Sequence, residues 1–189
     1  CIGMSEPDSG SDLASIRSKA VETVVNGQSG WVVTGRKVWT TYAQNSHYMI
    51  ALLRTGTTEE SRHDGTTQFL IDLSLPGVEV RPIRNMLGDE EFNEVTFDEV
   101  FVPDAMMIGA EGDGWRQVTA ELAFERSGPD RFLSAFALLV ELVRFVGALP
   151  PDAAAGAYDA VGRLYAHLAT LRALSISVAT RLDTGEEPA

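Results

Sequence analysis

The chain has 189 residues, of which 44% are apolar, so it can bury one sizeable core or two small ones. Its formal net charge of −12 disfavours nucleic acid and anionic membrane surfaces as partners, because both carry negative charge themselves. The one cysteine, Cys1, excludes an internal disulfide and suits a reducing compartment. No run of about 18 apolar residues occurs, so we expect no membrane span.

Residues 15–103 alternate short β-branched and apolar stretches with turn residues, a pattern that is typical of strands. Asn26-Gly27 is a hairpin signal, and the polar residues 55–65 predict a loop. The predicted strands cover residues 20–25, 31–41, 48–53, 67–73, 78–81 and 95–101, of which the third and fourth are apolar enough to be central. About six strands suit a small antiparallel barrel or sandwich.

From Trp115 onward the apolar residues recur at helical spacing, which predicts a long amphipathic helix to about Phe145. Gly128-Pro129 is expected to kink or break this helix, because proline removes a hydrogen bond and clashes with the preceding turn. Beyond Pro150-Pro151, residues 157–182 predict a second helix with apolar residues on one face. Two antiparallel helices form a hairpin, which cannot bury both of its faces alone.

Four segments form one pattern through their residues, their order and their spacing. They are residues 4–12 (MSEPDSGSD), 37–41 (KVWTT), 93–103 (NEVTFDEVFVP) and 112–115 (GDGW). Together they resemble the flavin-binding signature of the acyl-CoA dehydrogenase family, in which a T/S-E-P-x-x-G-S-D loop is followed by a K-x-W-x-T strand. The resemblance implies that the cofactor is FAD.

The resemblance implies an organisation in three consecutive parts: a helical N-terminal domain, a small middle β-barrel and a C-terminal four-helix bundle. The resemblance therefore implies a fragment, with the middle β-domain in residues 1–110 and the first half of the C-terminal helical domain in residues 111–189. The expected fold class is α+β, a small antiparallel β-barrel or sandwich followed by a helical hairpin that is half of a four-helix bundle. We expect the fragment alone to be inactive and the full-length form to be a homo-oligomer.

The loop of residues 4–12 contains small residues that let backbone N–H groups approach a ligand. Ser5, Ser9 and Ser11 add hydroxyl donors, so the loop can bind a flavin edge or a phosphate; a Ser/Asp-rich cap on a turn is the alternative. By resemblance, the Met4 backbone and Ser5 bond the pyrimidine side of the flavin. Gly10 is then part of the same cofactor loop, and Ser11 lies near the pyrophosphate and the acyl-CoA.

Trp39, Thr40 and Thr41 stand together on the second segment. Tryptophan offers a large flat apolar face to a tricyclic ring, and a neighbouring hydroxyl can donate to a ring nitrogen. The alternative is that Trp39 is a core residue, as Trp31 is expected to be. The resemblance places Trp39 beside the isoalloxazine and Thr41 at its hydride-accepting nitrogen, with Thr40 in the same cofactor-binding strand.

Glu125 is the candidate catalytic residue. One helical stripe contains positions 115, 118, 122, 125, 129 and 132, and every residue on it except Glu125 is apolar. A carboxylate there is desolvated unless it is paired, which favours its use as a base; an ion pair with Arg126 or Arg131 is the alternative. Residues 122–126 (LAFER) resemble the isovaleryl-CoA and long-chain enzymes, in which the base precedes an arginine on this helix. In many other members the base comes from a later loop.

The implied function is FAD-dependent α,β-dehydrogenation of an acyl-CoA thioester in fatty acid metabolism. Glu125 would abstract the Cα proton, and Ser11, Leu122 and Arg126 would contact the substrate. The resemblance implies an electron-transfer flavoprotein as the electron acceptor and a cytoplasmic location, or the mitochondrial matrix if the source is eukaryotic. The three histidines show no ligand spacing, so we expect no metal site. The alternatives are an acyl-CoA oxidase, a flavin monooxygenase, a dehydrogenase for carrier-bound acyl groups, or a non-catalytic partner subunit.

Overall fold

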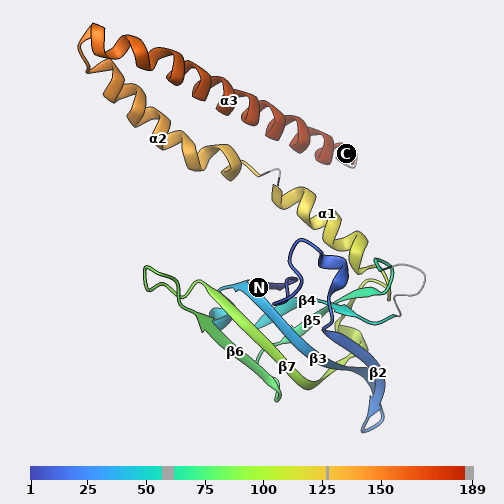
Figure 1. Cartoon of the computed structure of the whole chain (residues 1–189). Helices are drawn as coiled ribbons and strands as arrows, with labels where there is room; N and C mark the ends of the chain where they lie inside the picture. Colours follow the sequence, from blue (N-terminus) through green and yellow to red (C-terminus); the bar gives the residue numbers. More distant parts are fainter. Residues whose placement is uncertain (57–61, 127, 186–189) are drawn as a thin grey trace. The chain divides into compact units, whose positions relative to one another are not determined.

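A computed structural model describes residues 1–56, 62–126 and 128–185. The chain divides into two compact units, Cys1–Val118 and Thr119–Ala189. The first contains the strands and the second contains most of the helical residues (Figure 1). Part of the polar loop predicted at residues 55–65 lies outside the described residues.

The first unit is one mixed sheet of eight strands in the order β6-β7-β3-β2-β4-β5-β8, with β1 paired to β4. The strands are β1 (Ile2–Gly3), β2 (Lys19–Val25), β3 (Gln28–Thr41), β4 (Tyr48–Arg54), β5 (Thr66–Asp72), β6 (Val78–Ile83), β7 (Phe92–Pro103) and β8 (Met107–Ile108). All six predicted strands are present. The sheet is not purely antiparallel as expected, because β1 and β2 each run parallel to β4.

The Asn26-Gly27 turn joins β2 to β3. Both residues have left-handed backbone angles, φ 51° and 80°, which a two-residue hairpin turn of this kind requires. The resulting register pairs Val25 with Gln28 and Lys19 with Thr34. The predicted hairpin is therefore confirmed.

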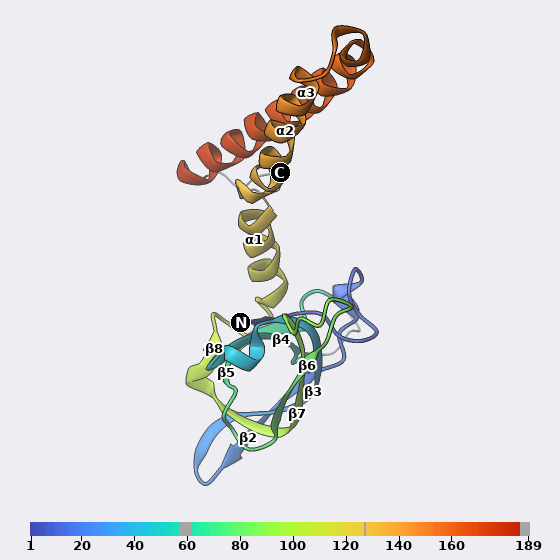
Figure 2. The same cartoon turned by 90° about the vertical axis from the view of Figure 1, so that its left-hand side faces the viewer.

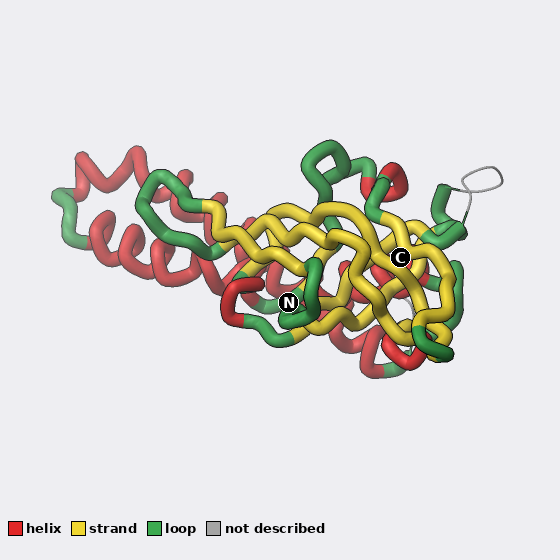
Figure 3. Tube along the Cα trace, turned by 90° about the horizontal axis from the view of Figure 1, so that it is seen from below, coloured by secondary structure: helices red, strands yellow, loops and turns green. Residues whose placement is uncertain are grey.

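The sheet curls around its own core (Figure 2), and Figure 3 shows the same strands from below in yellow. The core includes Val33, Met49, Leu53, Phe69 and Ile71, all fully buried. Trp31 joins them and meets Phe69 edge-on, with 5.5 Å between the ring centroids. The strands β4 and β5 are thus central, as their apolar sequences predicted, and Trp31 is a core residue.

Gly77 precedes β6 at a position that tolerates no side chain. Its φ is +88°, its carbonyl accepts a hydrogen bond from the Asp98 amide, and an added Cβ would collide with the Asp98 carbonyl oxygen. Gly27 has a similar φ of +80° but open space around it, so it provides a matched control. We expect Gly77→Ala to lower the free energy of unfolding by roughly 3 kcal/mol or more, and Gly27→Ala by only about 1 kcal/mol. Urea unfolding measures both. Equal losses would contradict the collision.

The helices are α1 (Gly114–Arg126), α2 (Asp130–Gly147) and α3 (Pro151–Asp183). The predicted break at Gly128-Pro129 is confirmed, because α1 ends before it and α2 begins after it. The second predicted helix starts six residues earlier than expected, at Pro151, where proline suits the first helical position because its missing N–H has no helical partner there. α2 and α3 pack as a hairpin. Among the described helices, none combines the length and apolarity needed to cross a membrane.

Candidate functional site

The loop of residues 4–12 is a tight turn stabilised by its own serine and backbone groups. The amides of Glu6 and Ser9 each donate to the other residue's carbonyl, at 2.9 and 3.0 Å. The Ser9 hydroxyl is buried and donates to the Asp12 carbonyl at 2.6 Å, and it also lies 2.9 Å from the Ser15 hydroxyl. Of the three predicted hydroxyl donors, Ser9 therefore has a role inside the loop. Ser5 is half-buried, and Ser11 is exposed beside the exposed Gly10.

A buried ion pair joins this loop to β3. The Lys37 ammonium lies 2.8 Å from Glu6 Oε1, and the Lys37 side chain is 0% exposed. Glu6 also accepts hydrogen bonds from the backbone amides of Arg17, at 2.7 Å, and Ser18, at 3.0 Å. The carboxylate and the ammonium therefore both have compensating partners in the interior, which burial of charge requires.

The charges of this pair are retained at neutral pH. Burial would raise the pKa of Glu6, but the Lys37 ammonium and the Arg17 and Ser18 donors together hold that pKa below its ordinary value. Burial lowers the pKa of Lys37 to about 8, although Glu6 opposes the shift. Lys37 is therefore mostly protonated at pH 7.

Two further contacts hold the loop against β3. The Val38 amide donates to the Ser5 carbonyl at 2.9 Å, and Lys37 Nζ donates to the Met4 carbonyl at 3.1 Å. Consecutive residues of β3 thus hold consecutive residues of the loop. The structure brings Met4 and Ser5 together with the strand segment that leads to Trp39.

Trp39 lies at a bulge in β3. Lys37 pairs with Val95 and Thr40 with Asn93, so two residues of β3 stand opposite one residue of β7. Trp39 has a left-handed φ of 61°, which is unusual for a bulky residue, and it is 60% exposed. Its ring meets Phe92 edge-on at 6.1 Å between centroids. The alternative interpretation of Trp39 as a core residue is therefore wrong.

The two threonines after Trp39 differ in burial. Thr41 is exposed, whereas Thr40 is buried and its carbonyl accepts a hydrogen bond from Asn93 Nδ2 at 3.1 Å. Of the two threonines, only Thr41 therefore has an exposed side chain, two residues after the exposed Trp39 ring. An exposed aromatic face next to an exposed hydroxyl and a fixed loop fits a flat ring with polar edges, such as that of a flavin.

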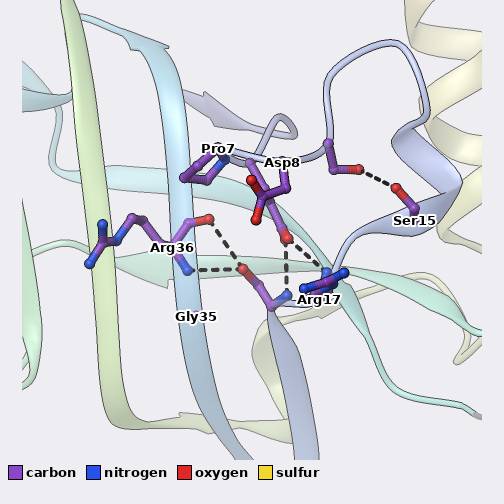
Figure 4. Close-up of a pocket in the computed structure, with 9 residues that line it drawn as sticks. Pro7, Asp8, Ser15, Arg17, Gly35 and Arg36 are labelled. Carbon is purple, nitrogen blue, oxygen red and sulfur yellow. Dashed lines mark hydrogen bonds between the residues drawn. The ribbon is translucent and has the colours of Figure 1, made fainter.

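An open cavity of ≈ 340 Å³ lies on one side of the loop (Figure 4). The loop contributes Pro7 and Asp8, and the opposite walls come from Ser15, Arg17 and β3. Among its lining residues, Glu6 accepts hydrogen bonds from the Arg17 and Ser18 amides, and the Arg36 amide donates to Ser18 Oγ at 3.0 Å. These hydrogen bonds connect the loop, the residues just before β2 and β3.

Glu125 lies near the end of α1, in the helical unit. Its side chain is 58% exposed, and its carboxylate accepts a hydrogen bond from Arg131 Nη2 at 2.8 Å. The expected desolvated stripe is absent from the described residues, because α1 ends at Arg126 and Pro129 and Phe132 do not continue its face. The ion-pair alternative therefore describes Glu125 in this chain. Leu122 is half-buried one turn earlier, and Arg126 is the last residue of α1.

Glu6 and Lys37 had no expected role, although both belong to the two flavin-binding segments, residues 4–12 and 37–41. The signal lies in the alternation of β3, since Trp31, Val33 and Lys37 fall on one face of the strand and the first two are core residues. A lysine on that face requires a buried acceptor. Among the described residues, no group of three or more histidine, cysteine or acidic side chains could hold a metal ion.

The ion pair predicts a specific acid response. At pH 7, Glu6→Gln should lower the free energy of unfolding by about 3 kcal/mol, because it leaves the Lys37 charge buried and unpaired. Since the pKa of folded Glu6 is lowered from 4.5, wild type should lose this contribution as the pH falls below about 4.5 and Glu6 takes up a proton. Urea unfolding of both proteins from pH 7 to pH 3 measures the difference between their free energies of unfolding. A constant gap between the two proteins would contradict this assignment.

The family described as "Acyl-CoA dehydrogenase, middle domain" matches residues 1–100. The chain therefore belongs to the acyl-CoA dehydrogenase family, whose members typically use FAD.

Curated relatives extend the similarity beyond the middle domain. Acyl-CoA dehydrogenase FadE34 of Mycobacterium tuberculosis is 43% identical over 164 residues, which is 87% of this chain and 22% of that protein. Acyl-CoA dehydrogenase IpdE1 of Mycolicibacterium smegmatis is 38% identical over 159 residues, or 78% of this chain and 40% of that protein. The chain thus spans less than half the length of these relatives.

Solved structures confirm the α+β fold class. Butyryl-CoA dehydrogenase from Megasphaera elsdenii superposes with a TM-score of 0.85 at 20% identity, covering 98% of this chain and 50% of its own. The Tcur3481-Tcur3483 steroid ACAD G363A variant has a TM-score of 0.81 at 26% identity, over 99% of this chain and 48% of its own. The ChsE4-ChsE5 complex from Mycobacterium tuberculosis has a TM-score of 0.77 at 26% identity, over 96% of this chain and 47% of its own.

Proposed function

We propose that this chain contributes the flavin-binding loop, the flavin-facing strand and the catalytic base of an enzyme that dehydrogenates acyl-CoA thioesters at Cα and Cβ. The observation that carries the proposal is the loop that Lys37 and Val38 hold by hydrogen bonds next to the exposed Trp39, in a chain of this family. Residues 1–110 would form the middle β-domain, and residues 111–189 the first part of the C-terminal helical domain.

The proposed cofactor contacts come from two adjacent segments. Trp39 would offer its exposed face to the isoalloxazine, and the Thr41 hydroxyl would donate to a ring nitrogen. The Met4 backbone and Ser5 would bond the pyrimidine edge. Thr40 could contribute through its backbone alone, because its side chain is buried.

Gly10 and Ser11 lie at the exposed end of the loop, where a phosphate could approach closely. We assign this end to the pyrophosphate and to the acyl-CoA. Asp12, the next residue, is neutralised in part by Arg62 at 3.0 Å, which reduces its repulsion of an anionic ligand. FAD, when bound, supplies a two-electron acceptor for the hydride that leaves Cβ.

The proposed base is Glu125, in the arrangement of the isovaleryl-CoA type. Its carboxylate would take the Cα proton, which the neighbouring thioester carbonyl acidifies, and Leu122 and Arg126 would contact the same substrate. Arg131 Nη2 lies 2.8 Å from this carboxylate and would have to release it before it could take the proton. We further propose an electron-transfer flavoprotein as the acceptor of the electrons and a homo-oligomeric enzyme.

The absorbance spectrum of the holoprotein that contains these residues tests this function. Addition of a substrate acyl-CoA should bleach the oxidised-flavin band, whereas the matching enoyl-CoA product should not. The panel should include straight, branched and steroid-side-chain thioesters, because one structural relative is named a steroid ACAD. Flavin that no thioester reduces would contradict dehydrogenation, and fast reoxidation by oxygen would favour an oxidase.

A second candidate is a non-catalytic partner subunit. One structural relative at 26% identity is the ChsE4-ChsE5 complex, and another at 26% identity is named for two proteins, Tcur3481-Tcur3483, which favours a two-component assembly here as well. The two candidates differ in what the purified protein does alone. Flavin retention and bleaching without a second protein support the first candidate, and recovery of both only on adding a partner supports the second.

A further inference from the structure

The buried ion pair contacts the loop that is assigned to the cofactor. Lys37 Nζ reaches two acceptors, Glu6 Oε1 at 2.8 Å and the Met4 carbonyl at 3.1 Å, and its side chain is completely buried. Glu6 in turn accepts hydrogen bonds from the Arg17 and Ser18 amides, which lie just before β2. The Lys37 ammonium therefore connects β3 to the loop, and the Glu6 carboxylate connects the loop to the residues just before β2.

Three consecutive residues of β3 connect the loop to the exposed ring. Lys37 points inward to the loop acceptors, the Val38 amide bonds the Ser5 carbonyl at 2.9 Å, and Trp39 turns outward at the bulge. The Lys37 ammonium and the Val38 amide therefore set the distance between the Met4–Ser5 backbone and the Trp39 ring. We propose that Glu6 and Lys37 are positioning residues, which hold the loop at the separation from Trp39 and Thr41 that a flavin requires. This inference rests on the proposed function.

The chemistry of the pair supports positioning rather than stability alone. A buried ion pair adds little net stability compared with apolar residues of similar volume, because both charges lose their hydration. An apolar pair could fill the same space, but it could not donate to the Met4 carbonyl. Lysine suits this task because its ammonium carries three donors that can bond a carbonyl and a carboxylate together.

The test compares two double variants in the holoprotein. Glu6→Gln/Lys37→Met removes both charges and leaves no unpaired ion in the interior. Arg36→Met/Glu94→Gln is the matched control, since it removes an exposed ion pair, 3.5 Å long, from the neighbouring position of β3. Measurements are the melting temperature, the FAD dissociation constant by fluorescence, and the position of the oxidised-flavin bands.

We expect the Glu6/Lys37 double variant to melt close to wild type, to bind FAD about tenfold or more weakly, and to show shifted flavin bands, because a site must be held to within about 0.5 Å. The control should match wild type in all three. Wild-type FAD affinity and bands in the Glu6/Lys37 variant would overturn the positioning role. A wild-type protein that never binds FAD would instead overturn the proposed function.

A milder variant keeps the test decisive if the double variant fails to fold. Glu6→Asp retains the charge and shortens the side chain by one methylene group, so the loop must shift to keep its bond to Lys37. FAD affinity should fall by about threefold to tenfold, with the far-ultraviolet circular dichroism unchanged. An unchanged affinity in folded Glu6→Asp would also overturn the positioning role.

Discussion

Replacing Glu125 with Gln is expected to slow flavin reduction by acyl-CoA about 10²- to 10⁴-fold, while FAD and acyl-CoA remain bound. Glutamine keeps the size of the side chain and removes the group that accepts the proton. Stopped-flow absorbance under single-turnover conditions measures the chemical step directly. Equilibrium titration with a product analogue measures binding separately.

Glu121→Gln is the matched control, since Glu121 lies one turn earlier on α1 and loses the same charge. It should reduce its flavin at nearly the wild-type rate. If Glu125→Gln also reduces its flavin within about threefold of wild type, the base lies elsewhere in the enzyme. Glu125 would then be only the ion-pair partner of Arg131.

Trp39→Ala and Thr41→Val should act on different steps. Loss of the indole face should weaken FAD binding by about 10- to 1,000-fold, because both apolar burial and ring stacking are lost. Loss of one hydroxyl should leave FAD bound and slow reduction by about tenfold to a thousandfold, if that hydroxyl is a preorganised donor. Flavin content after gel filtration and single-turnover rates separate the two effects.

Tyr42→Ala is the control for the first variant. Tyr42, three residues further along the chain, also has an exposed aromatic ring and a left-handed φ, 51° against 61° for Trp39. Its replacement should leave FAD binding within about threefold of wild type, because Tyr42 is not among the proposed FAD contacts and a surface substitution usually has a small effect. Equal loss of FAD in the Trp39 and Thr41 variants would contradict the division of roles.

Much of the fold follows from periodicity in the sequence. The alternation of β3 and the apolar runs of β4 and β5 predict these strands, and Asn26-Gly27 and Gly128-Pro129 mark a turn and a break that the structure contains. β1 and β8 have two residues each, which is too short to show any period. The early start of α3 was missed because proline also suits a first helical position.

The local chemistry of the site depends on contacts that no short motif encodes. The motifs mark the loop and the strand, but the Glu6–Lys37 contact joins residues 31 positions apart. The outward turn of Trp39 and the burial of Thr40 both result from a bulge that depends on the register with β7. The surroundings of Glu125 likewise depend on where α1 ends, so the pattern on one idealised helix predicted a face that the broken helix does not have.

The left-handed backbone at Trp39 has a consequence for protein engineering. A bulky residue in this conformation costs about 1–2 kcal/mol relative to glycine, and asparagine tolerates the same angles well. Selection for heat resistance alone would therefore favour Gly or Asn at position 39, and sequence-optimisation methods that reward backbone compatibility would choose them too. Such variants would gain stability and lose the exposed ring, the usual conflict between stability and activity. Programmes that aim at a hardier enzyme should hold this position constant and seek their gains elsewhere.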